Sequence, residues 1–250
     1  MFLPIGDEPN PPGRPVITIA LIAINVAVFL AVSLPLSMRP PDWADPLFDE
    51  YIRTLLPRLP PGASVDAVMG QVSAYDLFVY RWGFRADAPS LVTLFTCMFL
   101  HASVLHLVGN MVYLWVYGNN VEGRLGAPAY LFWYLATGVT ATGLHALFNR
   151  SSPLPLLGAS GAISGMLGFY LVWFPRNVVK VWVFLFPIYV GVVRLKAIAV
   201  LAVYLLLDNL LPFLIAPHGT GVAHGAHIGG FVVGMVVAWL LNWRRPMQPS

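Results

Sequence analysis

Long apolar runs, separated by short polar segments, dominate the chain from residue 16 onward. A helix needs about 20 mainly apolar residues to cross the hydrocarbon core of a bilayer, and several of these runs approach that length. A further apolar run, 178–189, is short and contains Pro187, so we expect an interfacial or re-entrant connection there. The pattern predicts an all-α membrane protein with six transmembrane helices, at residues 16–34, 105–117 with an upstream extension over 91–100, 130–148, 159–174, 197–215 and 222–243.

The composition points to the same environment. Hydrophobic residues make up 58% of the 250 residues and charged residues only 10%, whereas soluble domains carry about 25% charged residues. The net charge of +3 is too small and too dispersed to indicate nucleic-acid binding. A single cysteine, Cys97, excludes an intramolecular disulfide and a cysteine-type metal site. We therefore expect a multi-pass membrane protein without a metal or cofactor.

One long loop interrupts the predicted membrane domain of residues 16–243. Residues 35–90 mix acidic, basic and apolar side chains, which is typical of an amphipathic subdomain that rests on the membrane surface. Residues 1–15 carry acidic residues and prolines and do not resemble a cleavable signal. We expect 1–15 and the tail 244–250 to be cytoplasmic, with 35–90 forming a long external or interfacial loop.

The orientation follows from the lysines and arginines of the short loops. With the N-terminus inside, the cytoplasmic side holds most of them, and the short external loops hold only Arg150. The long loop is discounted because long loops cross largely regardless of charge. We expect both termini in the cytoplasm and the chain in the cell (inner) membrane. The second, fourth and sixth spans then all run from outside to inside.

Polar residues cluster near the starts of these three parallel spans. Because the spans share a direction, the polar residues should lie at one depth, just below the outer surface. Polar groups inside a membrane are costly, so such a cluster is by default a functional-site hypothesis. Its members are His101, His106 and Asn110 on the second span, Ser160 on the fourth, and His224 and His227 on the sixth.

Glycines share a face with the serine and with one histidine. Gly158, Gly161, Gly165 and Gly168 follow helical spacing around Ser160, and Gly230 and Gly234 share a face with His227. Such stripes let helix backbones approach closely, which would bring the hydroxyl within reach of the imidazole. A serine next to a base is what nucleophilic catalysis requires. His106 and Asn110, spaced i, i+4, could donate hydrogen bonds to a developing oxyanion.

Three motifs resemble the rhomboid family of intramembrane serine proteases. Residues 158–161, Gly-Ala-Ser-Gly, are similar to its Gly-x-Ser-Gly motif, and 226–230, Ala-His-Ile-Gly-Gly, to its Ala-His-x-x-Gly motif. Residues 101–110 are similar to its His-x4-His-x3-Asn motif, and the resemblance covers roughly residues 91–243. One position departs, because Val92-Thr93 stands where many members carry a Trp-Arg pair.

The resemblance implies a six-helix rhomboid bundle and a catalytic dyad. Ser160 would be the nucleophile and His227 the general base, while His106, Asn110 and the Ser160 backbone N–H would form the oxyanion hole. His101, Gly158 and Gly161 would support the site. The expected substrates are single-span membrane proteins, cleaved in or next to their transmembrane segments, and the expected surroundings are the lipid bilayer, not nucleic acid.

Alternatives remain open at this point. Asp208 in the fifth span could complete a Ser-His-Asp triad. Ser164 shares the face of Ser160 and is an alternative nucleophile, although packing is its simpler role. A non-catalytic rhomboid-like protein that binds transmembrane clients would be expected to lack Ser160 or His227. A transporter is disfavoured, because the polar cluster lies near one surface and the spans show no inverted repeat.

Overall fold

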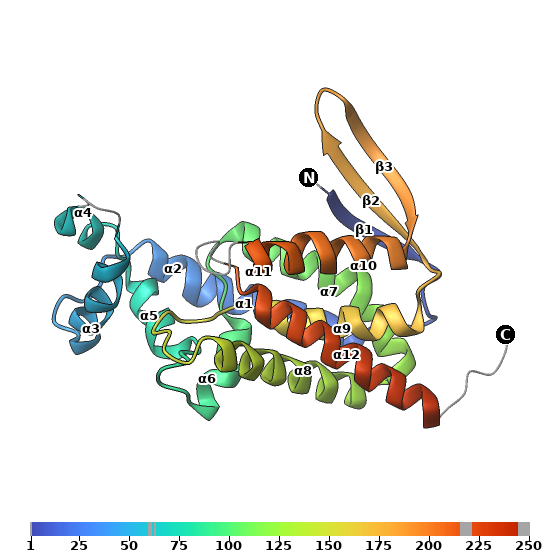
Figure 1. Cartoon of the computed structure of the whole chain (residues 1–250), viewed down its shortest axis with the longest axis horizontal. Coiled ribbons are helices and arrows are strands. Elements are labelled where there is room, and N and C mark those ends of the chain that lie inside the picture. The colour runs from blue at the N-terminus through green and yellow to red at the C-terminus, as the bar shows by residue number, and fades with distance from the viewer. Residues whose placement is uncertain (1, 60–61, 63, 216–221, 245–250) are drawn as a thin grey trace.

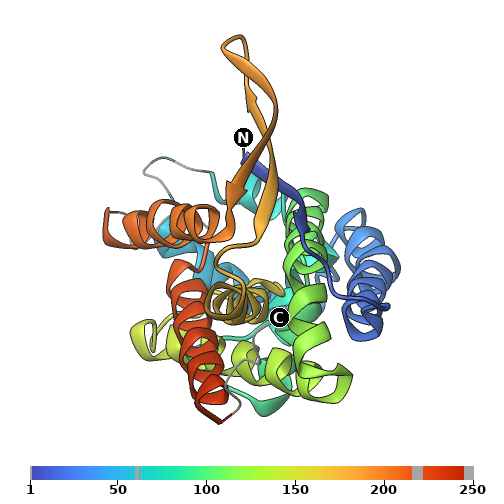
Figure 2. The same cartoon turned by 90° about the vertical axis from the view of Figure 1, so that its right-hand side faces the viewer.

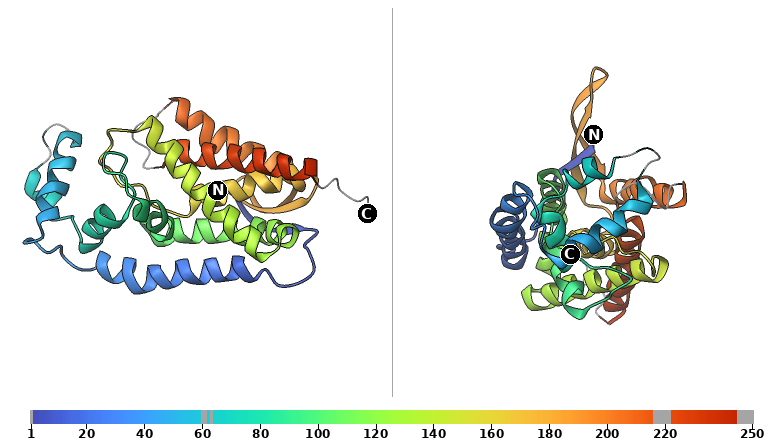
Figure 3. Two further views of the ribbon diagram at one scale, coloured as in Figure 1. Left: turned by 90° about the horizontal axis from the view of Figure 1, so that it is seen from below. Right: turned by 90° about the vertical axis from the view of Figure 1, so that its left-hand side faces the viewer.

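The chain folds as a helical bundle with a small β-sheet beside one end and a helical subdomain at the other (Figure 1). The computed structural model describes residues 2–59, 62, 64–215 and 222–244. The predicted tail 244–250 therefore lies outside the described residues, apart from the backbone of residue 244. The subdomain and the sheet extend the molecule in different directions (Figure 3).

Within the described residues, four continuous helical segments are long and apolar enough to cross a membrane. Large apolar side chains lie exposed on the outer surfaces of these helices, as at Leu30 and Leu214. Water would penalise that exposure, whereas lipid would not. The segments are Val16–Ser37 (α1 Val16–Val28, a π-helical turn Phe29–Ser33 and α2 Leu34–Ser37), Ala127–Phe148 (α8), Ala197–Ile215 (α10 Ala197–Leu205, a π-helical turn Leu206–Leu210 and α11 Leu211–Ile215) and His224–Asn242 within α12 (His224–Arg244).

The predicted second span is bent rather than continuous. Helix α6 (Leu91–Thr96) and the 3-10 turn Cys97–Phe99 lead into α7 (Val104–Leu125) at an angle of 92°. Ser103 explains the break, because its side chain accepts a hydrogen bond from the His106 backbone and so starts a new helix. The expectation that 91–100 would extend this span in line is corrected: α6 is a separate helix.

Helix α9 (Ser160–Trp173) occupies the centre of the bundle (Figure 2). It has 14 residues, fewer than a lipid-exposed span requires, but most of its side chains are buried by neighbouring helices. Its glycines explain the close approach of α12. A Cβ at Gly168 would lie 2.2 Å from the Phe231 carbonyl oxygen, and one at Gly234 would lie 2.0 Å from the Gly165 carbonyl oxygen. The predicted glycine stripe therefore forms a direct backbone contact between these two helices.

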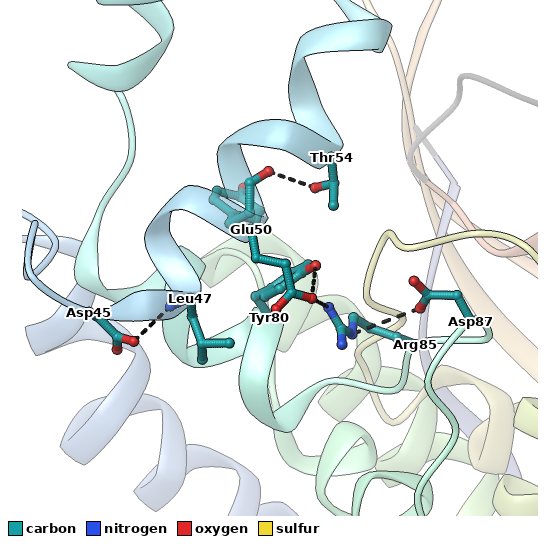
Figure 4. Close-up of polar contacts among 8 residues, drawn as sticks. Asp45, Leu47, Glu50, Thr54, Tyr80, Arg85 and Asp87 are labelled. Atoms are coloured by element: carbon teal, nitrogen blue, oxygen red, sulfur yellow. Dashed lines mark hydrogen bonds and ion pairs between the residues drawn. The ribbon is translucent and has the colours of Figure 1, made fainter.

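Residues 38–90 form a helical subdomain. It contains α3 (Pro46–Leu55), a 3-10 turn (Leu56–Arg58), α4 (Val65–Met69) and α5 (Ala74–Trp82). Glu50 of α3 accepts hydrogen bonds from the Tyr80 hydroxyl of α5 and from Arg85, both at 2.8 Å (Figure 4). The hydrogen bond from Arg85 lowers the pKa of Glu50. The Arg85 guanidinium also lies 4.1 Å from the centre of the Tyr80 ring. These contacts join α3 to α5 and to the segment that leads into α6.

A three-stranded antiparallel sheet lies beside the bundle, so the expectation of an all-α chain is corrected. Strand β2 (Val178–Leu185) is central and pairs with both β1 (Phe2–Glu8) and β3 (Tyr189–Lys196). In β2, Val179, Val181 and Val183 are buried while the residues between them are not, which is the alternation of a strand. The short length of the apolar run 178–189 does not distinguish a strand from an interfacial segment, whereas this alternation does.

The segment before α1 is tied to the bundle by buried polar contacts. Asp7 of β1 accepts hydrogen bonds from the Tyr170 hydroxyl of α9 and from the Asn120 amide of α7. Burial raises the pKa of Asp7 from 3.8 to about 6. Glu122 of α7 accepts hydrogen bonds at 2.8 Å from two backbone N–H groups in the first turn of α1, including that of Thr18. A carboxylate is favourable there because those N–H groups have no partner within the helix.

Candidate active site

Ser160 is the first residue of α9, immediately after a turn that requires glycine. Gly158 has a φ of +119°, which residues with a side chain rarely adopt. Its N–H donates to the Cys97 carbonyl at 2.8 Å, and Ala159 then starts the helix. This local chain path places the Ser160 hydroxyl at the end of a buried helix. The first turn also offers backbone N–H groups that have no acceptor within the helix.

His227 lies in the first turns of α12 and contacts Ser160 directly. The distance between His227 Nε2 and Ser160 Oγ is 2.7 Å. Close backbone packing sets this distance, because a Cβ at Gly230 would lie 2.3 Å from the Gly161 carbonyl oxygen. Gly161 itself packs against Ala141 of α8. The glycines on both helices thus let a serine and a histidine meet that are 67 residues apart in the chain.

The other ring nitrogen of His227 contacts Asn209, a residue that the sequence reasoning missed. The distance between His227 Nδ1 and Asn209 Oδ1 is 2.7 Å. The Asn209 amide nitrogen donates to the Tyr204 carbonyl at 2.8 Å, which fixes the orientation of the side-chain amide. Oδ1 can only accept, so Nδ1 must carry the proton. The Nε2 atom then has a free lone pair, which is the tautomer that can take a proton from Ser160.

Asn209 reaches the site because the fifth span contains a π-helical turn at Leu206–Leu210. The wider turn rotates the following residues relative to a regular α-helix, and such turns often lie at functional sites. Asn209 is buried, whereas its neighbour Asp208 is exposed. The alternative triad through Asp208 is therefore corrected: Asn209 occupies the position beside His227. The adjacent polar pair inside an apolar run was the available signal.

His106 and Asn110 line the same cavity as Ser160 and His227. A Cβ at Gly158 would lie 2.9 Å from His106 Cε1 and Nε2, so the imidazole edge lies directly against the Gly158 backbone. The Asn110 amide nitrogen donates to the His106 carbonyl at 2.9 Å and retains a second N–H. The structure thus places both expected oxyanion donors beside the nucleophile. Their roles remain predictions.

His101 lies behind His106 and outside the cavity. It is fully buried, and its ring centroid lies 5.1 Å from that of His106 in an edge-on arrangement. Its backbone N–H and carbonyl both bond the Tyr75 hydroxyl. Neither of its ring nitrogens has a hydrogen-bond partner among the described residues. His101 therefore supports the position of His106 by packing, and this is consistent with a supporting role.

Two other residues considered from the sequence lie next to the site. The Ser164 hydroxyl is buried and lies 2.6 Å from the Tyr204 hydroxyl, a contact that joins α9 to α10. Among the described residues it forms no hydrogen bond with a histidine, which fits the packing interpretation. The His224 ring lies 6.4 Å from the His227 ring, one turn away.

The cavity that contains the site has a volume of about 290 Å³. A larger cavity of about 610 Å³ lies by β1 and the end of α7, but its described lining contains no serine and no histidine. The chemistry therefore belongs to the smaller one. Among the described residues, no group of three or more His, Cys, Asp or Glu could hold a metal ion. The smaller cavity is lined by Leu105, His106, Gly109, Asn110, Tyr113, Ser160, Ile163, Tyr204, Val222 and His227.

Comparison with known proteins places all of these residues in one family domain. A family model described as Rhomboid domain matches residues 88–244. RHOMBOID-like protein 1 of Arabidopsis thaliana is 33% identical over 147 residues, which cover 59% of this chain and 33% of that protein. Rhomboid protein 1, mitochondrial, of Saccharomyces cerevisiae is 27% identical over 164 residues, covering 61% and 42%. Rhomboid protease GluP of Bacillus subtilis is 43% identical over 75 residues, covering 30% and 14%. The aligned chain thus spans less than half the length of each relative.

Proposed function

This chain belongs to the rhomboid family, and from that premise we propose that it is an intramembrane serine endopeptidase with Ser160 as nucleophile and His227 as general base. The observation that carries the proposal is the 2.7 Å contact between Ser160 Oγ and His227 Nε2. The contact between His227 Nδ1 and Asn209 supports it, because that contact selects the tautomer in which Nε2 accepts a proton.

The proposed reaction is acyl transfer in two steps. Ser160 Oγ attacks the carbonyl carbon of a substrate peptide bond while His227 Nε2 takes the hydroxyl proton. The same proton passes to the leaving amine nitrogen as the C–N bond breaks, which leaves an ester on Ser160. A water molecule, deprotonated by His227, then attacks the ester and releases the carboxyl product. Serine and histidine return to their starting protonation states.

Negative charge develops on the carbonyl oxygen in both steps. The Ser160 backbone N–H lies at the N-terminus of α9, where the helix dipole favours an anion. His106 and Asn110 line the same cavity as Ser160 and can each donate a hydrogen bond. We infer that these three groups form the oxyanion hole. Preorganised donors of this kind often contribute the largest single share of catalysis.

The proposed substrates are transmembrane segments of single-span proteins. A regular helix hides its peptide bonds in its own hydrogen bonds, so a substrate must unwind locally before Ser160 can attack. The site lies at the starts of α7, α9 and α12. We infer six spans, counting α9 as one despite its length, because neighbouring helices rather than lipid surround it. From the excess of short-loop cations we infer that both termini are cytoplasmic and that the site lies near the outer surface.

A fluorophosphonate probe tests the nucleophile and separates a protease from a non-catalytic client-binding protein. The wild-type protein should be labelled covalently and should cleave a single-span substrate in proteoliposomes. Ser160→Ala should lose both activities while its thermal stability stays near that of the wild type. Ser164→Ala is the matched control and should retain labelling. If Ser160→Ala were labelled and active, the nucleophile assignment would be wrong. If the wild type bound clients without labelling or cleavage, the client-binding alternative would replace the protease.

A further inference from the structure

The tip of the β2–β3 hairpin is apolar on both faces. From Val181 to Val193 the chain contains no charged residue. The side chains at the turn are among the most exposed large hydrophobic residues described, with Phe186 77% and Ile188 87% exposed. An exposed cluster of this kind in water is costly and marks a contact surface.

Among the described residues, the rest of the molecule covers the base of the hairpin but not its tip. Val179, Val181 and Val183 are buried against the bundle. Strand β1 covers one edge of β2, but its pairing extends no further than Phe2 opposite Val183. Beyond that point β2 and β3 continue as a two-stranded ribbon to Leu185 and Tyr189. The packing that explains apolar residues at the base therefore does not explain those at the tip.

Charge is confined to the opposite end of the hairpin. Lys180 pairs in register with Arg194, and Val178 pairs with Lys196. Glu8 of β1 bonds both Lys180 and Arg194, which leaves an excess of cations at the base. Phe186 lies six positions after Lys180, a length of roughly 20 Å at about 3.3 Å per residue. The ribbon is thus amphipathic along its length: the end next to the bundle is cationic and the tip is apolar.

The hairpin also projects sideways from the bundle, to where a surrounding membrane would lie. Figure 1 shows it starting at the end of the bundle where α10 begins and leaning back, so that its tip lies level with α10 rather than beyond it. Figure 2, which looks along the helices, shows it projecting sideways from the bundle. Helix α10, which follows β3 directly, also has exposed apolar residues, among them Ile198 and Val203.

We propose that the hairpin tip, residues 184–190, inserts into the lipid–water boundary of the leaflet on the α10-start side, which is the cytoplasmic leaflet in the orientation proposed above. The apolar turn contacts acyl chains, and the cations at the base lie among anionic headgroups. Tyr189 and Trp182, near the tip, are residue types enriched at this boundary. The occupant is lipid, because the span that follows β3 directly also exposes apolar side chains, which a membrane would cover.

The backbone of the ribbon limits its depth. Strand β3 is an edge strand, and half of its backbone groups point away from β2. Unpaired backbone groups are not tolerated in the hydrocarbon core. The tip must therefore stay shallow, where water and headgroups can satisfy those groups. This inference depends on membrane embedding of the bundle and is independent of catalysis by Ser160.

Depth-dependent fluorescence quenching tests the proposal. The full chain with Cys97→Ala carries one new cysteine, labelled with the environment-sensitive dye NBD, in vesicles of phosphatidylcholine and phosphatidylglycerol. Ile188→Cys reports on the tip. Val203→Cys on α10 is the lipid control, and Asp49→Cys, an exposed residue of α3, is the water control. Nitroxide lipids carry the quencher either near the headgroup or near the end of the acyl chain.

The proposal expects blue-shifted emission at position 188 relative to position 49, and stronger quenching by the shallow nitroxide than by the deep one. Phe186→Glu in the Ile188→Cys protein should reduce both effects while fluorophosphonate labelling of Ser160 is unchanged. Emission and quenching equal to those of Asp49→Cys would overturn the proposal. So would stronger quenching by the deep nitroxide. Shielding at position 188 without lipid quenching, lost when the protein is diluted in lipid, would assign the tip to contact with a second copy. A chain that shows the lipid contact but does not cleave substrate would refute the proposed protease and leave this inference intact.

Discussion

Replacing Asn209 by alanine removes the oxygen that holds His227 Nδ1 and leaves the Ser160 and His227 side chains themselves unchanged. In the wild type, the Asn209 amide selects the tautomer of His227 and fixes the plane of its ring. Without it, the imidazole can rotate or carry its proton on Nε2, and neither state can deprotonate Ser160. The variant should therefore fold and bind substrate but react slowly.

The size of the effect follows from the change in charge of His227 during the reaction. A hydrogen bond between neutral groups contributes about 0.5–1.5 kcal/mol, and one to a charged group about 1.5–3 kcal/mol. His227 becomes an imidazolium in the transition state, so its bond to Asn209 strengthens there. Loss of about 1.5–3 kcal/mol of transition-state stabilisation corresponds to a decrease in kcat of roughly 10- to 100-fold. KM should change little, because Asn209 does not line the cavity.

Steady-state cleavage of a single-span substrate in proteoliposomes measures this prediction, with thermal unfolding recorded for every variant. Asn209→Asp keeps an acceptor oxygen and should recover much of the lost kcat. Asp208→Ala is the matched control on the same π-helical turn and should retain wild-type kcat, because its side chain is exposed. The reasoning is refuted if Asn209→Ala keeps wild-type kcat. It is also refuted if Asn209→Asp stays as inactive as Asn209→Ala while both remain stable.

Three further changes test other contacts. Gly230→Val should abolish proteolysis and lower the melting temperature, because a Cβ there would lie 2.3 Å from the Gly161 carbonyl oxygen. The control Gly143→Val should have a mild effect, because a Cβ at that position meets no atom within 4 Å. Equal melting temperatures for the two variants would contradict the close packing of α9 and α12. Asn110→Ala should lower kcat about 10²–10³-fold without eliminating it, and unchanged turnover would remove Asn110 from the oxyanion hole. Because burial raises the folded-state pKa of Asp7 to about 6, native stability should fall as pH rises from ~4 to ~6 and stay lower above that range. Asp7→Asn should flatten this dependence in pH-resolved thermal unfolding and gain about 1–3 kcal/mol over the wild type at pH ~8; parallel pH profiles for the two proteins would show that Asp7 is not the titrating group.

The sequence by itself determined the features that depend on contiguous residues. Apolar runs of sufficient length predicted the helical segments at 16–34, 130–148, 197–215 and 222–243, because helix length and hydrophobicity are properties of contiguous residues. Motif spacing singled out Ser160 and His227, and helical spacing predicted that glycines would share their faces. The structure then brought the two side chains to 2.7 Å. In each case the relevant period, 3.6 residues, could be read directly along the chain.

Only the tertiary structure decided the features that depend on contacts between distant segments. The paired residues of β1 and β2 are at least 170 positions apart, and no pattern within either segment predicts this pairing. The Ser103 cap marks where α7 begins, but the angle of 92° between α6 and α7 also depends on the packing of α6 against α8 and α5. Asn209, rather than Asp208, faces His227 because a π-helical turn rotates the fifth span. A difference of one residue in helix register has almost no signature in hydrophobicity, but it moves a side chain by about 100° around the helix and so decides which polar group enters the site.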